Sequence, residues 1–293
     1  FVLGACFALI GAFLSSTPPF QNAMAMDANR CGIPVVYGFC RGVGSVSYAA
    51  AVLLLGFVLE RHAPTLLLPV FAALTACGLL AMSGFRLPER PDEAADRPAE
   101  HRSIAAVLRS HPRFALTLLG CMFFFLTHTI SNTYMNALVG KAGGTASAVG
   151  TSLAISAVLE LPAMTLVSRL QKRFSPGFFL RFAAGAEVVK FLIFYLARSM
   201  PLIYLGQCMQ FFQFAVYAPA TVYYVAAALP ERDQLKGQSL IYVAGSGLGG
   251  ALGNLLGGRL LDRSGIQAAL LLGTVSAAAS LLTFCLSTRK DSR

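Results

Sequence analysis

Four charged residues lie inside long apolar stretches of this chain. Glu160 lies in "AISAVLELPAMTLVSRL", with apolar residues for two helical turns on either side. Glu187 and Lys190 lie in "AEVVKFLIF", three residues apart, where one helical face would let them pair. Arg41 stands among glycines in "YGFCRGVG". Because a charge at the centre of a membrane helix costs about 3 kcal/mol on insertion scales, such residues usually face a cavity or a partner. They predict an internal polar site that binds a solute or moves protons.

The composition places these residues in a membrane. Of 293 residues, 56% are hydrophobic and 12% are charged, whereas a soluble domain carries about 25% charged residues. Apolar stretches of about 20 residues, the length that crosses a bilayer, recur along the chain. The sequence therefore predicts an all-α, multi-pass membrane protein with nine spans, at residues 1–26, 34–59, 64–86, 112–138, 145–169, 176–198, 201–229, 238–260 and 265–287.

A polar segment, "RLPERPDEAADRPAEHRS", separates three spans from six. Its prolines and mixed charges cannot build a core, so it predicts a linker, and the following "IAAVLRSHPRF" suggests a short interfacial helix. We expect three helices in residues 1–86, a cytoplasmic linker at residues 87–111 and six helices in residues 112–293.

Most Lys and Arg lie in this linker, in the loops on its side of the membrane and in the C-terminal tail. This distribution is typical of cytoplasmic segments. The net charge of +10 therefore favours a cell-membrane protein with a cytoplasmic C-terminus, in a bacterial inner membrane, over a nucleic-acid partner.

The sequence does not favour an enzyme, a metal site or a cofactor. The seven cysteines are scattered, mostly in apolar segments, without a CxxC pair. The four histidines form no HxxxxD or HExxH pattern, and no GxSxG motif occurs. The phosphate-binding pattern GxxxxGK[ST] of ATP-driven pumps is also absent from the sequence.

Four segments carry a recognisable pattern: "YGFCRGVGSVSYA", "GGTASAVGTSLAISAVLELPAMTLVSRL", "LPERDQLKGQSL" and "GSGLGGALGNLLGGRLLDRSG". In this order and spacing they resemble the major facilitator superfamily (MFS), in particular the proton-linked sugar and nucleoside symporters related to lactose permease. The resemblance covers essentially the whole chain. It implies a twelve-helix bundle that alternates access around a midplane site. This chain would carry helices four to twelve, with the first three expected to precede Phe1.

The resemblance also implies substrate-binding residues. Glu160 matches the substrate-binding acid of helix eight. Arg41 matches the helix-five arginine that binds sugar hydroxyls together with an acid from helix four. The nearest candidate for that acid is Asp27, towards the cytoplasmic end of the first span, and the polar group deeper in the span is Asn22. A structural carboxylate at Glu160, and a packing role for Arg41, are the alternatives.

Proton coupling and gating follow from the same resemblance. Lys190 falls near a helix-nine arginine implicated in proton coupling, so Glu160, Glu187 and Lys190 form the expected proton-coupling set. A self-contained ion pair between Glu187 and Lys190 is the alternative. Asp262 and Arg263 lie at a loop, where they would cap helix ends, and the resemblance implies a gating role.

Two further stretches supply uncharged polar residues. "THTISNTYMN" holds two asparagines four residues apart, with His128 one turn earlier, which predicts a cavity-lining face. "GQCMQFFQFAVYAP" departs from the permease pattern, since glutamines and a tyrosine stand where the family has a histidine and an acid. We expect these groups to bind sugar hydroxyls, with packing as the alternative. The expected uncharged substrate-binding residues are Asn22, Asn132, Asn136, Gln210, Gln213 and Tyr217.

Together these features predict a monomeric secondary transporter of a small polar solute, a sugar, oligosaccharide or nucleoside, driven by protons in symport. Its partners would be the solute, protons and the lipid bilayer. Proton-antiport efflux of drugs or metabolites shares the fold, although an exporter would more often have a bulky aromatic cavity with few charges. The sequence also leaves open a membrane enzyme and a non-transporting truncated remnant.

Overall fold

The computed structural model describes residues 10, 17–29, 31–59, 64–84 and 103–289. Within these residues every regular element is a helix, which confirms the all-α prediction. Residues 17–29 form the first helical segment. The remaining elements are α2 (Tyr37–Leu59), η1 (Pro64–Leu66), α3 (Leu67–Ser83), α4 (Ile104–Ser110), α5 (Pro112–Thr133), α6 (Met135–Lys141), α7 (Ala146–Leu170), α8 (Pro176–Leu196), α9 (Met200–Cys208), η2 (Met209–Phe211), α10 (Phe214–Ala228), α11 (Glu231–Tyr242), η3 (Val243–Gly249), α12 (Gly250–Ser264) and α13 (Ile266–Ser287).

Local sequence signals set several helix ends. Ser103 and Ser175 cap α4 and α8, because each side chain accepts a hydrogen bond from a backbone N–H of the first turn. Proline occupies the first turn of α5, α8 and α9, where its missing N–H costs no hydrogen bond. Gly265, at φ +76°, makes the sharp turn between α12 and α13.

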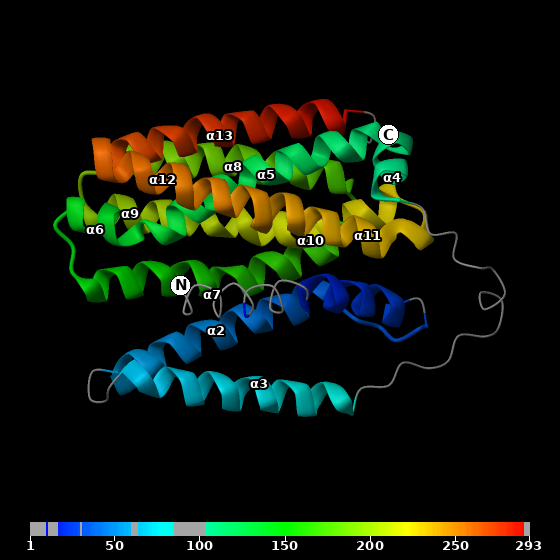
Figure 1. Cartoon of the computed structure of the whole chain (residues 1–293), viewed down its shortest axis with the longest axis horizontal. Helices are drawn as coiled ribbons and strands as arrows, with labels where there is room; N and C mark the ends of the chain where they lie inside the picture. Colours follow the sequence, from blue (N-terminus) through cyan, green and yellow to red (C-terminus); the bar gives the residue numbers. More distant parts are fainter. Residues whose placement is uncertain (1–9, 11–16, 30, 60–63, 85–102, 290–293) are drawn as a thin grey trace.

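The long helices run roughly along one axis of the molecule (Figure 1). A C-terminal bundle is built around α5, α8, α10 and α13, which contact one another through a core of aromatic and aliphatic side chains. α7 lies on the side of this bundle that faces α2, and α2 packs along α7 (Figure 1). The packing of α2 against α7 therefore joins the N-terminal helices to the C-terminal bundle.

Glycines bring α2 and α7 into close contact. A Cβ atom on Gly38 would overlap the carbonyl oxygen of Met164, and one on Gly42 would lie 2.6 Å from the Cα of Leu161. The N–H of Gly38 donates to Ser168 Oγ at 2.9 Å. Small residues four apart are a common device for close helix packing in membranes.

A second glycine stripe holds η3 and α12 against α5. Its members recur every four residues, and an added Cβ on any of them would meet α5 or the adjoining Tyr134 within 2.7 Å: Gly245, Gly249, Gly253 and Gly257. η3 is a π-helical segment that connects α11 and α12 without a loop. This irregular stretch faces Phe125, which becomes part of the site described below.

Two predicted spans are interrupted. The span predicted at residues 112–138 is divided at Tyr134, where α5 ends and α6 begins. The span predicted at residues 201–229 is divided between η2 and α10, and Gln213 at the break has φ −99° and ψ −94°. Discontinuous helices are common at transporter sites because the freed backbone groups line a cavity.

The loop expected at residues 230–237 is instead helical. Helix α11 begins at Glu231, and Glu231 and Asp233 lie in its first turn. Acidic side chains there interact favourably with the positive end of the helix dipole, which accounts for the early start.

The linker predicted at residues 87–111 lies largely outside the described residues, but its last part forms α4, as expected for the short helix after the linker.

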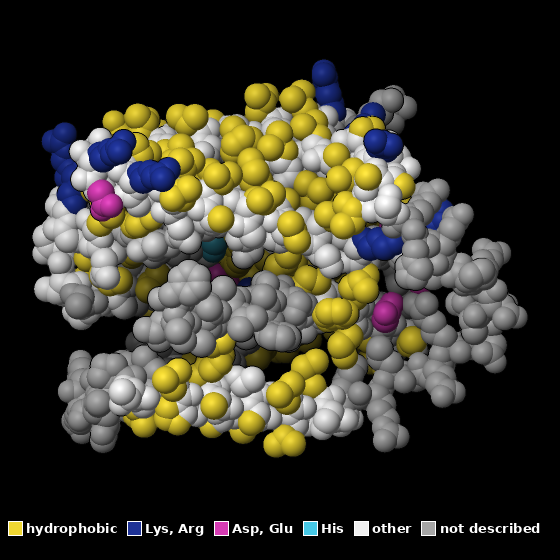
Figure 2. Space-filling model, viewed as in Figure 1, with side chains coloured by type: hydrophobic (Ala, Val, Ile, Leu, Met, Phe, Trp, Pro, Cys, Tyr) yellow, Lys and Arg dark blue, Asp and Glu magenta, His cyan; other side chains and the backbone are white. Residues whose placement is uncertain are grey.

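The described surface fits a membrane protein. Figure 2 shows Lys and Arg side chains gathered mostly near the two ends of the long axis, with a mainly hydrophobic middle. By length and composition, five described helical stretches could cross a bilayer: Pro112–Thr133, Ser147–Leu170, Met200–Ala228, Glu231–Ser264 and Ile266–Ser287. Leu68–Ser83 is a shorter apolar helix. The count of nine crossings stays a prediction.

Candidate functional site

Two cavities lie between α2 and the C-terminal bundle. The larger, which we call the aromatic cavity, measures about 630 Å³ and is bounded by residues 18–25, α2, α5, α10, α11 and η3. The smaller, which we call the acid cavity, measures about 420 Å³ and is bounded by α2, α5, α7, η2 and Phe214. Arg41, Gly44 and Phe214 line both. The two cavities are therefore neighbours that meet at Arg41 and Phe214.

Glu160 lines the acid cavity from the middle of α7, and its side chain is only 8% exposed. Both carboxylate oxygens are hydrogen bonded. Gln210 Nε2 donates to Glu160 Oε1 at 3.0 Å, and Ser45 Oγ donates to Glu160 Oε2. A carboxylate has about four lone-pair sites, so each oxygen can still accept a further hydrogen from a solute.

These contacts belong to a longer hydrogen-bonded chain across four elements. On the α2 side, Arg41 Nη1 donates to Ser45 Oγ at 3.2 Å. On the α8 side, Lys190 Nζ donates to Gln210 Oε1 at 2.9 Å. The chain therefore runs from Arg41 through Ser45, Glu160 and Gln210 to Lys190. It connects two cations on α2 and α8 to a single carboxylate on α7.

The break in the seventh predicted span places Gln210 in this chain. Gln210 lies in η2, between α9 and α10, and is 4% exposed. Because its amide offers both a donor and an acceptor, it can bond Glu160 and Lys190 at the same time. The helix break therefore has a direct role in building the site.

Glu187 has different surroundings. It is fully buried, its Oε2 has no hydrogen-bond partner among the described residues, and its Oε1 lies 2.6 Å from Thr127 Oγ1. Thr127 Oγ1 also lies 2.6 Å from the carbonyl oxygen of Phe124, which can only accept. A hydroxyl has one hydrogen. If Thr127 gives that hydrogen to Phe124, the hydrogen between Thr127 and Glu187 must belong to Glu187, which is the arrangement of a protonated carboxyl.

The self-contained ion pair between Glu187 and Lys190, the alternative that their spacing left open, is not formed. Within the described part of the chain, Lys190 donates to Gln210 and lies 5.6 Å from the ring centre of Phe194, while Glu187 bonds Thr127. Spacing along a helix makes a pair possible, but here tertiary partners on η2 and α5 provide the hydrogen bonds instead.

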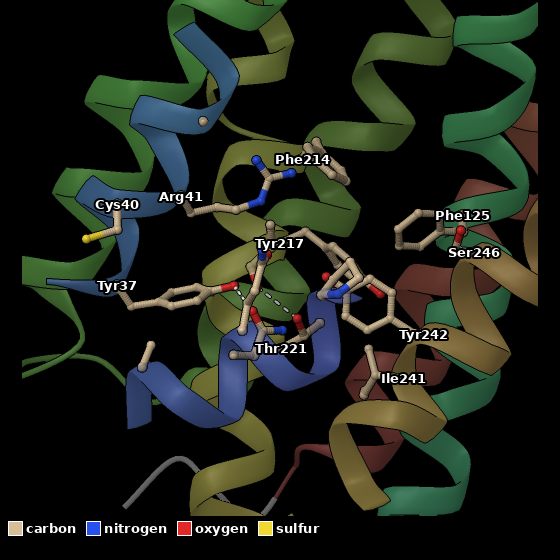
Figure 3. Close-up of a pocket in the computed structure, with 16 residues that line it drawn as sticks. Tyr37, Cys40, Arg41, Phe125, Phe214, Tyr217, Thr221, Ile241, Tyr242 and Ser246 are labelled. Atoms are coloured by element: carbon tan, nitrogen blue, oxygen red, sulfur yellow. Dashed lines mark hydrogen bonds between the residues drawn. The ribbon is translucent and has the colours of Figure 1, made fainter. Parts of the chain in front are cut away.

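An aromatic wall forms the border between the two cavities. The His128 and Phe214 rings stack with centres 4.2 Å apart, and Phe125 lies edge-on to both His128 and Phe214. Tyr217 is edge-on to Phe125 and stacks on Phe124, with ring centres 3.9 Å apart. Figure 3 shows the Arg41 side chain reaching from α2 into the aromatic cavity, towards Phe214.

Asn132 fixes the orientation of His128. The Asn132 Nδ2 lies 3.0 Å from His128 Nε2, and an amide nitrogen can only donate. His128 Nε2 therefore accepts, and the ring proton is on Nδ1, which has no partner among the described residues. Both residues line the acid cavity, as predicted for Asn132.

Other expected site residues are divided between the cavities and their surroundings. Asn22 lines the aromatic cavity, where its Oδ1 accepts from the Tyr37 hydroxyl at 2.7 Å. Tyr217 lines the same cavity with its ring, and its hydroxyl is buried beside Cys121. Gln213 is fully buried with an amide that bonds no described group, and it lines neither cavity.

The remaining expected residues lie outside the site. Asn136 is exposed on α6, beyond the break at Tyr134, so it does not share the cavity face of Asn132. Asp262 and Arg263 are exposed near the end of α12 and line neither cavity. The break between α5 and α6 explains why the four-residue spacing of the asparagines did not bring them together.

The sequence analysis missed several residues of the site, among them Ser45, Thr127, Phe125 and Phe214. Ser45 stands four residues after Arg41, so the helical spacing was a usable signal for the first of them. Neither a threonine nor a phenylalanine is unusual in an apolar helix. No group of three or more His, Cys, Asp or Glu side chains that could hold a metal ion is found in the described ranges.

The chain is similar to known proteins over nearly its whole length. Residues 2–272 match the model of the MFS_1 like family. The chain is similar to maltose permease of Geobacillus stearothermophilus, with 28% identity over 286 residues that cover 97% of this chain and 71% of that protein. It is also similar to an uncharacterized transporter, YwbF, of Bacillus subtilis (strain 168), with 23% identity over 97% of this chain and 70% of that protein.

Proposed function

This chain belongs to the MFS_1 like family, a family of multi-pass membrane transporters, and we propose that it moves a small polar solute by proton-coupled symport. The solute would be a sugar, an oligosaccharide or a nucleoside. The observation that carries this proposal is the hydrogen-bonded chain from Arg41 to Lys190, with Glu160 at its centre and a cavity on either side of Arg41. The similarity to a protein named maltose permease supports a sugar.

Glu160 would bind the solute. It faces the acid cavity with free lone pairs, and Asn132, Gln210 and Ser45 surround it with further donors and acceptors. A sugar hydroxyl can donate to the carboxylate and accept from a neighbouring amide, so the group of side chains suits polyhydroxylated solutes. The aromatic wall at Phe214 offers a flat apolar surface for the C–H face of a sugar ring.

Glu187 would carry the proton. It lies in α8, apart from both cavities, in an environment that fits a protonated carboxyl. Lys190 lies on the same helix and contacts the solute-binding chain through Gln210. A change at Glu160 on solute binding would therefore reach Gln210 and Lys190 through hydrogen bonds, and the charge of Lys190 lies three residues from Glu187 on the same helix.

Alternating access would come from movement between residues 1–86 and residues 112–293, joined by the linker at 87–111. The cavities lie between α2 and the C-terminal bundle, so relative motion of these parts would open and close them. Asp262 and Arg263 remain candidates for a gate at the end of α12. We place the protein in a cell membrane with its C-terminus in the cytoplasm.

Efflux by proton antiport is the second candidate. The aromatic cavity is lined by five aromatic side chains and contains one charged residue, Arg41. This is the kind of cavity expected of an exporter of aromatic compounds. The direction of solute movement in a pH gradient separates the two functions.

The test uses the purified protein in liposomes with an imposed pH gradient. The solute panel contains maltose, uridine, 4-nitrophenyl glucoside and 4-nitrophenyl glucuronide. Symport predicts that at least one solute accumulates against its gradient when the lumen is alkaline, up to about tenfold for each pH unit, and that a protonophore abolishes this. Accumulation driven only by sodium would exclude the proton, and accumulation only in liposomes with an acidic lumen would favour antiport.

A further inference from the structure

The two cavities differ in their chemistry. The acid cavity contains Glu160, an acceptor for hydroxyl groups. The aromatic cavity is lined by sixteen described residues, and none of them is an aspartate or glutamate. The sequence of residues 1–16 contains no acidic residue either. Among the described residues, a carboxylate that can accept hydrogen bonds from the hydroxyls of a neutral sugar therefore lines the acid cavity but not the aromatic cavity.

Arg41 has donors to spare on the side of the aromatic cavity. A guanidinium has five N–H donors. Within the described part of the chain, Arg41 makes one hydrogen bond, to Ser45 Oγ, and has no carboxylate within ion-pair distance. Figure 3 shows this side chain extending into the cavity towards Phe214.

Nearby polar groups are also donors. The Asn22 carbonyl oxygen accepts from the Tyr37 hydroxyl, and the Asn22 side chain also hydrogen bonds the Tyr242 hydroxyl. The Tyr217 hydroxyl is buried beside Cys121, so Tyr242 supplies the hydroxyl nearest to Arg41 in the lining that can still donate. This part of the cavity therefore offers the Arg41 donors together with the Tyr242 hydroxyl to a group that accepts hydrogen bonds.

The charges of the site are unbalanced when Glu187 holds a proton. Arg41 and Lys190 then face a single anion, Glu160; Lys190 and Glu160 are buried and Arg41 is half-buried. A charge without a counter-charge is costly in such buried surroundings. A solute with one negative charge would balance the second cation, whereas a neutral sugar would not.

We propose that the preferred solute is a monoanionic sugar, such as a uronate or a uronate glycoside. Its carboxylate binds Arg41 in the aromatic cavity, in the paired geometry that arginine makes with carboxylates. Its hydroxyls bind Glu160 in the acid cavity, and a ring or aglycone stacks on Phe214. This inference rests on the proposed function, since it identifies the solute of the same site.

The test compares 4-nitrophenyl glucuronide with 4-nitrophenyl glucoside, which differ only in a carboxylate in place of a hydroxymethyl group. Binding of each to the purified wild-type protein is measured by titration calorimetry in detergent. We expect the glucuronide to bind at least about tenfold more tightly, the effect of a charge-assisted hydrogen bond. Arg41→Gln should remove this preference, and Arg41→Lys should keep part of it. Arg259→Gln, which removes an exposed arginine outside both cavities, should keep all of it.

Transport provides an independent measurement. One proton carried with a monoanion moves no net charge, whereas one proton carried with the neutral glucoside moves one positive charge inward. Uptake of the glucuronide by the liposomes should therefore produce no transport current, and uptake of the glucoside should produce one.

Each outcome decides between the proposals. If the wild-type protein binds the glucoside as tightly as the glucuronide or more tightly, the inference of an anionic solute is overturned, and no variant is needed to show it. Proton-driven uptake of that glucoside would leave the proposed function intact. A preference for the glucuronide that survives in Arg41→Gln would also overturn the inference, since the carboxylate would be bound elsewhere. Binding and transport of neither sugar would overturn the inference, and the proposed function would fall with it only when maltose and uridine also fail to accumulate.

Discussion

The molecule contains two buried glutamates in very different environments. Glu160 lines a cavity and accepts hydrogen bonds on both oxygens, from Ser45 and Gln210. Glu187 is sealed inside the bundle, with one oxygen unpartnered among the described residues and the other beside the Thr127 hydroxyl, which has the Phe124 carbonyl oxygen as a second acceptor. The first environment supplies two donors to a carboxylate at a cavity, and the second supplies at most one donor to a carboxyl away from both cavities. We therefore assign solute binding to Glu160 and proton transport to Glu187 in the proposed function.

Glu160→Gln should have the largest effect, because it removes the anion at the centre of the hydrogen-bonded chain. An amide presents a second N–H to Gln210 or Ser45, both of which donate in the wild type. We expect solute affinity to fall about 100-fold, since two charge-assisted hydrogen bonds are altered. Calorimetric titration with the best solute of the panel measures this.

The matched control for Glu160 is Glu231→Gln, an exposed glutamate on α11 that lines neither cavity. It should bind solute like the wild type. Solute affinity in Glu160→Gln within about twofold of the wild type would remove Glu160 from the binding site.

Glu187→Gln should separate proton transport from solute binding. Glutamine keeps the shape of a protonated glutamate but cannot release a proton. In a pH gradient of one unit, accumulation should fall from about tenfold to none, while exchange of internal for external solute continues at nearly the wild-type rate. Radioactive uptake and exchange in the same liposomes measure both. Normal accumulation in this variant would assign the proton to another group.

Gln210→Leu should test the link between the two sites. It leaves the Lys190 ammonium buried without its hydrogen-bond partner, so we expect a loss of stability of about 1–3 kcal/mol. Thermal unfolding in detergent measures the change. The double variant Gln210→Leu with Lys190→Met should recover much of the loss, because no buried charge is then unpartnered. A single variant as stable as the wild type would show that Gln210 does not hold Lys190.

Gly42→Ala should disturb the contact between α2 and α7 and, through it, the Glu160 site. The new methyl group would lie 2.6 Å from the Leu161 Cα, which forces α2 away from α7 and weakens the bond from Ser45 to Glu160. We expect a destabilisation of about 1–3 kcal/mol and weaker solute binding. Gly150→Ala, on α7, has open space around the added carbon and is the control. Equal stability of the two variants would contradict the close packing of these helices.

Much of the fold was predictable because it depends on length and hydropathy. Within the described residues the apolar stretches located the long helices, while most of the span predicted at residues 1–26 lies outside them, and the quoted motifs correctly indicated the MFS family. The breaks at Tyr134 and Gln213 were not predictable, since neither has the proline or glycine that usually marks a helix end. They arise from tertiary contacts, such as the Tyr134 hydroxyl donating to the Asn254 carbonyl oxygen at 2.6 Å.

The site was predictable only in part, because the hydrogen-bond partners of its charged residues are also set by tertiary contacts. A carboxylate in an apolar helix attracts attention because it is costly there, so Glu160 and Glu187 stood out. Their partners did not, because serine, threonine and glutamine are tolerated in many places in a membrane helix. The alternative of an ion pair between Glu187 and Lys190 followed from spacing on one helix. The structure instead gives each residue a partner on a different helix, which only the tertiary arrangement could reveal.

The most direct test of the contrast between the glutamates is the infrared absorption of protonated carboxyl groups in the purified protein at neutral pH. The wild type, Glu160→Gln and Glu187→Gln are compared under the same conditions. We expect the absorption of a buried, protonated carboxyl to disappear in Glu187→Gln and to remain in Glu160→Gln. Loss of that absorption in Glu160→Gln, with Glu187→Gln unchanged, would show that the roles of the two glutamates are reversed.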